Sequence, residues 1–183
     1  LMAIGTPAAR DASAAGRLVR LPNGLTVYIL RDARFPLVCT RLYVRAGSAN
    51  EAPGQAGISH LLEHMVFKGT EHRPKGQVAR DVEALGGYLN AATSFDKTWY
   101  MTDMPAAHWR TGMDVVKDMA FQAQLDPKEL EAEKNVVISE LQRGEDSPMS
   151  KLYENLQVAG LKNTHYGRPI IGYVVTIKAV TAQ

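Results

Sequence analysis

The chain has 183 residues, of which 45% are hydrophobic and 22% are charged, which is the size and composition of one globular domain and excludes a disordered tail. Its 21 basic and 19 acidic residues give a net charge of +2 and are spread along the sequence, so we expect no nucleic-acid partner. No apolar run approaches the ~18 to 20 residues of a membrane-spanning helix, so we expect no membrane span.

Residues 1–16 are rich in Ala, Ser and Gly and have no hydrophobic periodicity. We interpret them as a linker, a tag or the remnant of a processed leader, because small residues are typical of a signal-peptide cleavage site. A leader would indicate the bacterial periplasm or secretion, with the cytoplasm as the alternative. Residues 17–183 are expected to form the domain itself. We expect it to be truncated at its C-terminal end, because Thr181 resembles an N-cap with no helix after it.

The first part of this domain has the pattern of β-strands. Residues 17–21 and 25–30 are strand-like, and the Pro-Asn-Gly of residues 22–24 predicts a hairpin between them. Residues 37–46 are rich in β-branched and aromatic side chains and predict a third strand. It contains the only cysteine, Cys39, which we expect to be a small buried apolar residue.

A short helix is then expected to carry two histidines and a glutamate on one side. In the run Gly-Ile-Ser-His-Leu-Leu-Glu-His-Met-Val-Phe of residues 57–67, His60 and His64 are one helical turn apart, and Glu63 is also on this side. Two such imidazoles bind a divalent metal, and the carboxylate beside them can accept a proton from a metal-bound water. The alternative is a chance grouping on an amphipathic helix. The apolar neighbours favour the metal, because buried ionisable groups are costly unless they are paired or metal-bound.

The middle of the chain alternates helices and strands. Residues 77–85 predict a helix that ends at two glycines. Residues 88–93 and 98–104 predict a second hairpin, whose first strand lies at a sheet edge. Pro105 is expected to begin a helix through about Gln122. Its apolar stripe comprises Trp109, Met113, Val116 and Phe121.

A long helix is predicted from Asp126 to about Arg143, since Asp126 is a suitable N-cap and a proline follows it. Two acids, Glu133 and Glu140, share its buried side. The apolar residues that mark this side are Val136, Val137 and Leu141. Another helix is predicted over residues 148–161.

The two histidines need one more donor, because a catalytic zinc usually takes three protein ligands. We choose Glu140, since a buried carboxylate without a basic neighbour in its helix is best explained by a cation. Glu133 is then expected to hydrogen-bond a ligand or the water. Without a metal, these acids and histidines would pair with each other or change protonation. The other histidines have no partner at ligand spacing: His72, His108 and His165.

The run His60-Leu-Leu-Glu63-His64, followed by Glu133-Lys-Asn-Val-Val-Ile-Ser-Glu140, resembles the inverted-motif zinc peptidases. This is the pitrilysin family, which includes mitochondrial processing peptidase and insulin-degrading enzyme. Three supporting runs extend the resemblance over nearly all of residues 17–181: residues 67–70, 86–91 and 166–172. We therefore expect an α+β fold like one half-domain of these metallohydrolases. Its mixed, mostly antiparallel sheet would have helices packed on one face.

The resemblance implies one zinc per chain on His60, His64 and Glu140, with Glu63 as general base and Glu133 assisting catalysis. It also implies that a peptide or small protein substrate adds to the edge strand at residues 89–93. Asn90 and Ala91 would then lie beside the scissile bond; the alternative is that Asn90 is only a hairpin-end residue.

Family enzymes complete the active chamber with a second homologous half, in the same natural chain or in a partner subunit, which contributes an Arg and a Tyr. The present chain alone is therefore expected to bind zinc and to cleave peptides poorly or not at all.

Three functions are compared. The first is a zinc endopeptidase domain. The second is a non-catalytic family scaffold or assembly subunit, which is opposed by the presence of all four motif residues. The third is a metal-dependent lyase that shares the His-x-x-Glu-His helix but takes its third ligand from a downstream cysteine. The only thiol here, Cys39, lies upstream of the motif.

Overall fold

The computed structural model describes residues 16–182. The predicted linker, tag or leader remnant therefore lies, apart from Gly16, outside the described residues. The chain divides into two compact units, residues 1–36 and 37–183. Within residues 16–182, none of the helices combines the length and the apolar character that a membrane crossing requires.

The first unit contains the predicted N-terminal hairpin. Strands β1 (Arg17–Arg20) and β2 (Thr26–Ile29) pair antiparallel, with Arg17 opposite Ile29. Gly24 in the turn has a φ of +89°, a conformation that glycine adopts without steric cost. The Asn-Gly signal therefore predicted the hairpin correctly.

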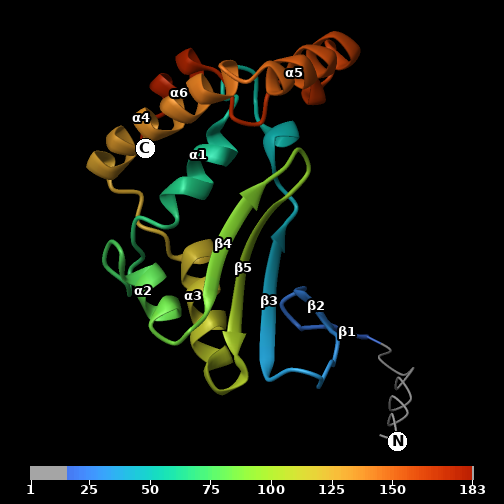
Figure 1. Cartoon of the computed structure of the whole chain (residues 1–183), viewed down its shortest axis with the longest axis vertical. Coiled ribbons are helices and arrows are strands. Elements are labelled where there is room, and N and C mark those ends of the chain that lie inside the picture. The colour runs from blue at the N-terminus through green and yellow to red at the C-terminus, as the bar shows by residue number, and fades with distance from the viewer. Residues whose placement is uncertain (1–15, 183) are drawn as a thin grey trace, which may run out of the picture. The chain divides into compact units, whose positions relative to one another are not determined.

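The second unit is built on a three-stranded antiparallel sheet. Its order is β3 (Leu37–Val44), β5 (Thr98–Pro105), β4 (Tyr88–Thr93). In this register Leu37 lies opposite Pro105 and Tyr88 lies opposite Asp103. Strand β4 is at the edge of this sheet, as predicted (Figure 1).

Helices pack on one face of this sheet, which confirms the predicted α+β fold. Alternate residues of β5 are buried: Thr98, Tyr100, Thr102 and Met104. Helices α1 (Ile58–Met65), α2 (Gln77–Glu83) and α3 (Trp109–Phe121) contact the sheet. The central cluster combines residues from the sheet with Val78, Val82, Val115 and Met119.

A second cluster joins α1 to the C-terminal helices α4 (Pro127–Glu145) and α6 (Val174–Ala179). It consists of Leu61, Met65, Leu130, Val137 and Ile177. Helix α5 (Pro148–Leu161) follows α4, as predicted. Helix α6 was not predicted, because six residues rich in valine and threonine carry no helical periodicity.

Two predicted helix faces need correction. Helix α3 begins at Trp109 and not at Pro105, because Pro105 ends β5 and a 3-10 turn, Ala106–His108, intervenes. In its predicted stripe, Val116 is buried but Met113 and Phe121 are exposed. The stripe instead follows Val115, Val116 and Met119, so the buried face is rotated about the helix axis from the predicted one.

In α4, Val137 is buried but Val136 is 45% exposed, which contradicts the predicted face. The buried residues of α4 are Leu130, Glu133, Lys134 and Val137, so the buried face is turned away from Val136. Glu140 follows Val137 one turn later, but its side chain is 40% exposed. Only one of the two acids is therefore fully buried.

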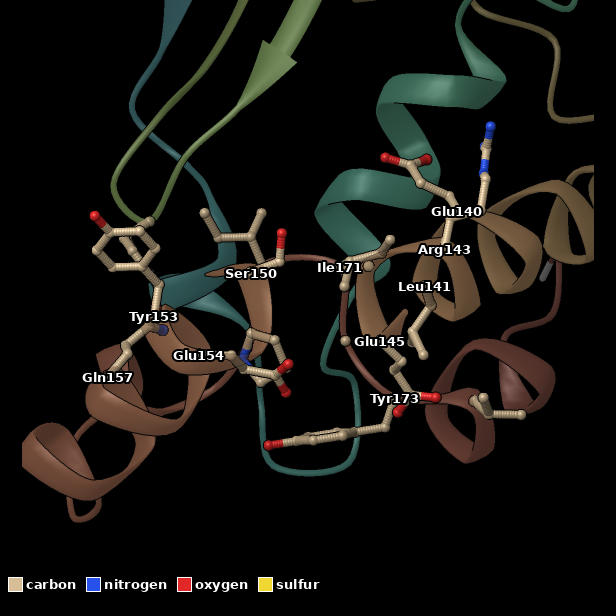
Figure 2. Close-up of a pocket in the computed structure, with 16 residues that line it drawn as sticks. Glu140, Leu141, Arg143, Glu145, Ser150, Tyr153, Glu154, Gln157, Ile171 and Tyr173 are labelled. Carbon is tan, nitrogen blue, oxygen red and sulfur yellow. The ribbon is translucent and has the colours of Figure 1, made fainter. Parts of the chain in front are cut away.

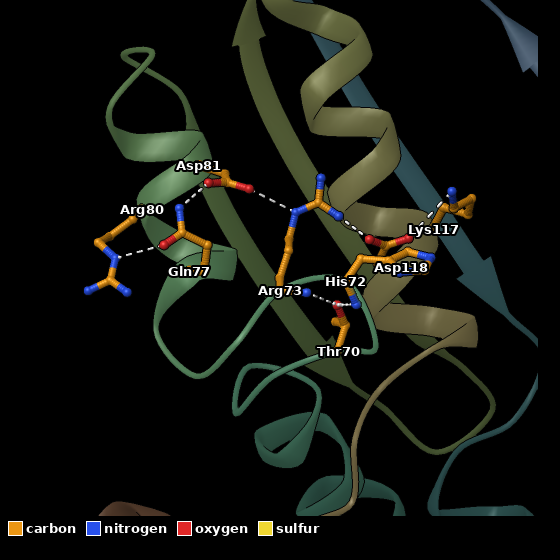
Figure 3. Close-up of polar contacts among 8 residues, drawn as sticks. All are labelled: Thr70, His72, Arg73, Gln77, Arg80, Asp81, Lys117 and Asp118. Carbon is orange, nitrogen blue, oxygen red and sulfur yellow. Dashed lines mark hydrogen bonds and ion pairs between the residues drawn. The ribbon is translucent and has the colours of Figure 1, made fainter.

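A charged network holds α2 against α3 (Figure 3). The Arg73 guanidinium donates to Asp81 of α2 at 2.9 Å and to Asp118 of α3. Asp118 is 1% exposed, so its charge requires this partner. The network orients the segment between α1 and α2.

Candidate metal centre

Helix α1 presents the two motif histidines from consecutive turns. The ring centroids of His60 and His64 lie 4.7 Å apart. Leu61 and Met65 each follow a histidine by one residue, about 100° around the helix; both are 1% exposed and pack on α4. This packing fixes the rotation of α1 and directs both imidazoles along the surface of α4.

Glu140 of α4 meets both rings. Its Oε1 lies 3.8 Å from His60 Nε2, and its Oε2 lies 3.5 Å from His64 Nε2. The potential ligand atoms of the three residues all lie within 4.8 Å of one another, and no other group of three metal-binding side chains occurs among residues 16–182. The structure thus brings together the three residues predicted as ligands.

The donor set fits zinc. Two imidazole nitrogens and a carboxylate oxygen match catalytic zinc sites, in which three protein ligands leave one position open. Zinc bonds of ~2.1 Å in a tetrahedral arrangement separate neighbouring donors by about 3.4 Å, close to the observed distances of 3.5 and 3.8 Å.

Glu133 lies behind His64. The His64 Nδ1–H donates to Glu133 Oε1 at 2.8 Å, since an ionised carboxylate can only accept. Lys68 Nζ lies 2.5 Å from the other oxygen. Because His64 carries its proton on Nδ1, the lone pair is on Nε2, the nitrogen that faces Glu140. Although burial raises the pKa of Glu133, the hydrogen bonds from Lys68 and His64 outweigh it and lower that pKa below its usual value.

His60 is held in the form that binds metal. Burial lowers the pKa of His60, and the neighbouring His64 lowers it further. The neutral imidazole is therefore favoured, which is the ligand form. His60 Nδ1 is buried and has no hydrogen-bond partner among the described residues.

Glu63 lies near His60 and Tyr100, because its charge acts on the pKa of both. Its Oε2 is buried and has no donor within residues 16–182. Burial and the charge of Glu63 together raise the pKa of Tyr100, so the carboxylate lies near Tyr100 of β5. The register partner of Tyr100 is Ala91. Glu63 is thus close to the middle of the edge strand.

Asn90 and Ala91 occupy the centre of β4, opposite Met101 and Tyr100. Asn90 is therefore not a hairpin-end residue, because the turn begins after Thr93. Its Oδ1 accepts the Ala91 N–H at 2.9 Å, and its Nδ2 donates to the Tyr88 hydroxyl. Among the described residues β4 pairs only with β5, so no strand lies on its other side.

The remaining candidate ligands lie elsewhere. The three other histidines are exposed and belong to no metal-binding group: His72, His108 and His165. Cys39 is exposed on β3, not buried as predicted, because it lies on the sheet face opposite the helices. It does not join the histidines, so the cysteine-ligated lyase arrangement is absent from the described residues.

A groove of about 830 Å³ adjoins the centre between α4, α5 and residues 169–174. Figure 2 shows the Glu140 carboxylate pointing toward α1, at the margin of this groove. Two contacts at the centre were not predicted, those of Lys68 with Glu133 and of Glu51 with the start of α1. The sequence offers one weak indication of these contacts: Lys68 and Glu51 are charged residues among apolar or glycine-rich neighbours.

Comparison with known proteins agrees with this geometry. Residues 27–173 match the family described as Insulinase (peptidase family M16). The chain is 35% identical over 155 residues to an uncharacterized zinc protease of Bacillus subtilis, covering 85% of the chain and 38% of that protein. It is 29% identical over 167 residues to a probable mitochondrial-processing peptidase subunit beta of Arabidopsis thaliana, covering 91% and 32%.

Among solved structures, a protease from Helicobacter pylori superposes with a TM-score of 0.86 and 28% identity, covering 91% of this chain and 41% of that one. The present chain thus spans about two fifths of the length of such relatives, or less.

Proposed function

Because the chain belongs to the Insulinase family of peptidases, peptidase family M16, we propose that it is the zinc-binding part of a metalloendopeptidase. The observation that carries the proposal is the convergence of His60 Nε2, His64 Nε2 and the Glu140 carboxylate. These three residues hold one zinc per chain.

Bound zinc would supply a Lewis acid that polarises the scissile carbonyl and acidifies water. Glu63 acts as general base, because one of its oxygens has no donor among the described residues and its charge lies near His60. It takes the proton from the attacking water and passes it to the leaving amine. Glu133 accepts from His64 Nδ1–H and keeps the metal-facing nitrogen unprotonated.

The substrate is a peptide or small protein that adds as a strand to the open edge of β4. Main-chain hydrogen bonds there are independent of side chains, so they provide affinity for many sequences. Asn90 and Ala91 lie beside the scissile bond, since Ala91 pairs with Tyr100 and Tyr100 is near Glu63.

A second homologous half completes the enzyme, in the same natural chain or in a partner subunit. The support is the length of the relatives, of which this chain matches 32 to 41%. The 183-residue chain alone is therefore expected to bind zinc and to turn over peptides slowly.

The test is metal analysis of demetallated and zinc-reconstituted protein. Wild type should bind one zinc per chain, and His64→Ala should lose it. His108→Ala is the matched control, because this exposed histidine is outside the metal-binding group. Absence of stoichiometric zinc from the wild type would overturn the proposal.

Catalysis is tested separately with Glu63→Gln in the full-length protein, joined to its second half. This variant should keep its zinc and lose peptide hydrolysis, because the ligands remain but the base is removed. A full-length wild type that binds zinc and cleaves nothing in a peptide library would instead support a scaffold role.

A further inference from the structure

Helix α1 cannot cap its own N-terminus. Its N-cap is Gly57, which has a φ of +95° and no side chain to accept a hydrogen bond. A Cβ atom at this position would lie 2.5 Å from the carbonyl oxygen of Ile171. The usual capping residues, Ser, Thr, Asp or Asn, are therefore sterically excluded at the start of the helix that carries both histidines.

Glu51 supplies the missing cap from outside the helix. Its Oε2 accepts the Gly57 N–H at 2.9 Å, and its Oε1 accepts the Ser59 N–H at 2.8 Å. Glu51 is only 5% exposed. A buried negative charge thus lies at the positive end of α1, and His60 directly follows the bonded Ser59.

The backbone of Glu51 is itself held by a distant segment. Arg168 donates to the carbonyl oxygens of Glu51 at 2.9 Å and Ala52 at 3.3 Å. On the other side, Ala49 N–H donates to the Phe95 carbonyl at 2.8 Å, in the turn between β4 and β5. The backbone on both sides of Glu51 is therefore held in place, and this positions its carboxylate at the start of α1.

We propose that Glu51 is a positioning residue for the metal centre. It holds the first turn of α1, and with it the His60 ring, against α4, and its buried charge favours a cation at that ring. Glu51 does not touch the metal and acts through His60. The inference rests on the proposed function, since it concerns the affinity of the same site.

A purely structural cap would stabilise the fold without influencing the metal, and the chain offers a matched control for that role. Asp126 caps α4 by accepting the N–H groups of Lys128 and Glu129. Like Glu51, Asp126 is an acid that accepts two backbone N–H groups at the start of a helix. However, none of the three proposed ligands lies in the helical turn that it caps.

The experiment compares Glu51→Ala, Glu51→Gln and Asp126→Ala in the 183-residue chain. Zinc affinity is measured by competition with a chromophoric chelator, the ligand field by the absorption of bound Co²⁺, and metal-free stability by thermal unfolding. We expect Glu51→Ala to bind zinc about 10- to 100-fold more weakly, as for other residues that orient a ligand, with an altered Co²⁺ spectrum. Glu51→Gln keeps the shape and one acceptor, so its loss should be smaller.

Asp126→Ala should lower the thermal midpoint but leave zinc affinity and the Co²⁺ spectrum unchanged. The inference is overturned if wild type binds zinc and neither Glu51 variant binds it more weakly than Asp126→Ala. If Glu51→Ala does not fold, the comparison of Glu51→Gln with Asp126→Ala decides. Failure of wild type to bind zinc would overturn the proposed function as well, and it is seen before any variant is made.

Discussion

The carboxylate of Glu133 lies between a cation and an imidazole. Its side chain is only 6% exposed, and each oxygen has one donor, Lys68 Nζ or His64 Nδ1–H. Removal of either donor would leave an oxygen of a buried charge without its partner. Lys68 therefore stabilises the residue that orients His64.

At this scale we predict that Lys68→Met destabilises the metal-free protein by about 1 to 3 kcal/mol, the cost of leaving a buried acceptor unpaired. Lys75→Met is the matched control. Lys75 pairs with Glu129, which lies in α4 like Glu133, but the Lys75 side chain is 64% exposed. An exposed pair is worth only ~0.2 to 1 kcal/mol. Urea unfolding measures both, and equal losses would contradict the prediction.

At the scale of elements, the loop before α1 lies close to the backbone near Ile171, and this restricts which residues the loop can hold. Gly54 and Gly57 both have positive φ values, +85° and +95°. Nothing lies within 4 Å of a Cβ built at Gly54, whereas at Gly57 the Ile171 carbonyl oxygen is 2.5 Å away. Of these two glycines, only Gly57 combines backbone strain with steric exclusion.

Gly54→Ala should therefore cost about 1 to 2 kcal/mol, the penalty of a left-handed conformation for an L-residue. Gly57→Ala should cost ~1 to 3 kcal/mol more, because the new methyl group displaces the segment near Ile171. Chemical denaturation of the metal-free variants measures the difference. Equal stability of the two variants would contradict the prediction, because it would mean that the segment near Ile171 moves aside without a cost in free energy.

The sheet contains a titrating contact between strands. Arg41 of β3 donates to Asp103 of β5 at 2.7 Å. This hydrogen bond lowers the pKa of Asp103 below its ordinary value of 3.8, although burial acts in the opposite direction. A carboxyl group with a lowered folded pKa stabilises the protein above its unfolded pKa, and this contribution disappears as the pH falls through the folded pKa.

Asp103→Asn should thus destabilise the metal-free protein at pH 7 and have little effect at pH 2. Both side chains are about one third exposed, so the loss at pH 7 should be at most ~1 kcal/mol. Urea unfolding of wild type and variant at the two pH values measures it. A deficit that is the same at both would show that the charge is not its cause.

At the scale of the whole molecule, the proposed centre couples α1 to α4. His60 and His64 come from one helix and Glu140 from the other, so a bound ion would link the two directly. Metal that binds only the folded form adds stability in proportion to the logarithm of its concentration. Metal removal should therefore lower the unfolding temperature.

Zinc at 100 times its dissociation constant should stabilise the chain by ~2.7 kcal/mol, which for a domain of this size raises the unfolding temperature by about 5 to 10 °C. Differential scanning calorimetry with and without zinc measures this shift. Mg²⁺ should have no effect, because it prefers oxygen ligands. A shift that persists in His64→Ala would place the ion elsewhere.

Local patterns predicted much of the fold because they depend on near neighbours. Both hairpins follow from turn residues between strand-like runs, and α4 follows from its Asp126 cap. The phases of α3 and α4 were partly wrong, because apolar residues such as Phe121 and Val136 remain exposed. Which stripe is buried depends on the element that packs against the helix, and periodicity alone does not identify it.

The sequence by itself determined that His60 and His64 share one side of a helix, since helical geometry requires this of residues one turn apart. It also pointed to Glu140, an acid on the predicted buried side of the later helix, although Arg143 follows it by three residues. Only the tertiary structure decided that Glu133 bonds both His64 and Lys68, and that Glu51 and Arg168 hold the start of α1. These contacts join residues far apart in the chain, so their distances depend on how the helices and loops pack.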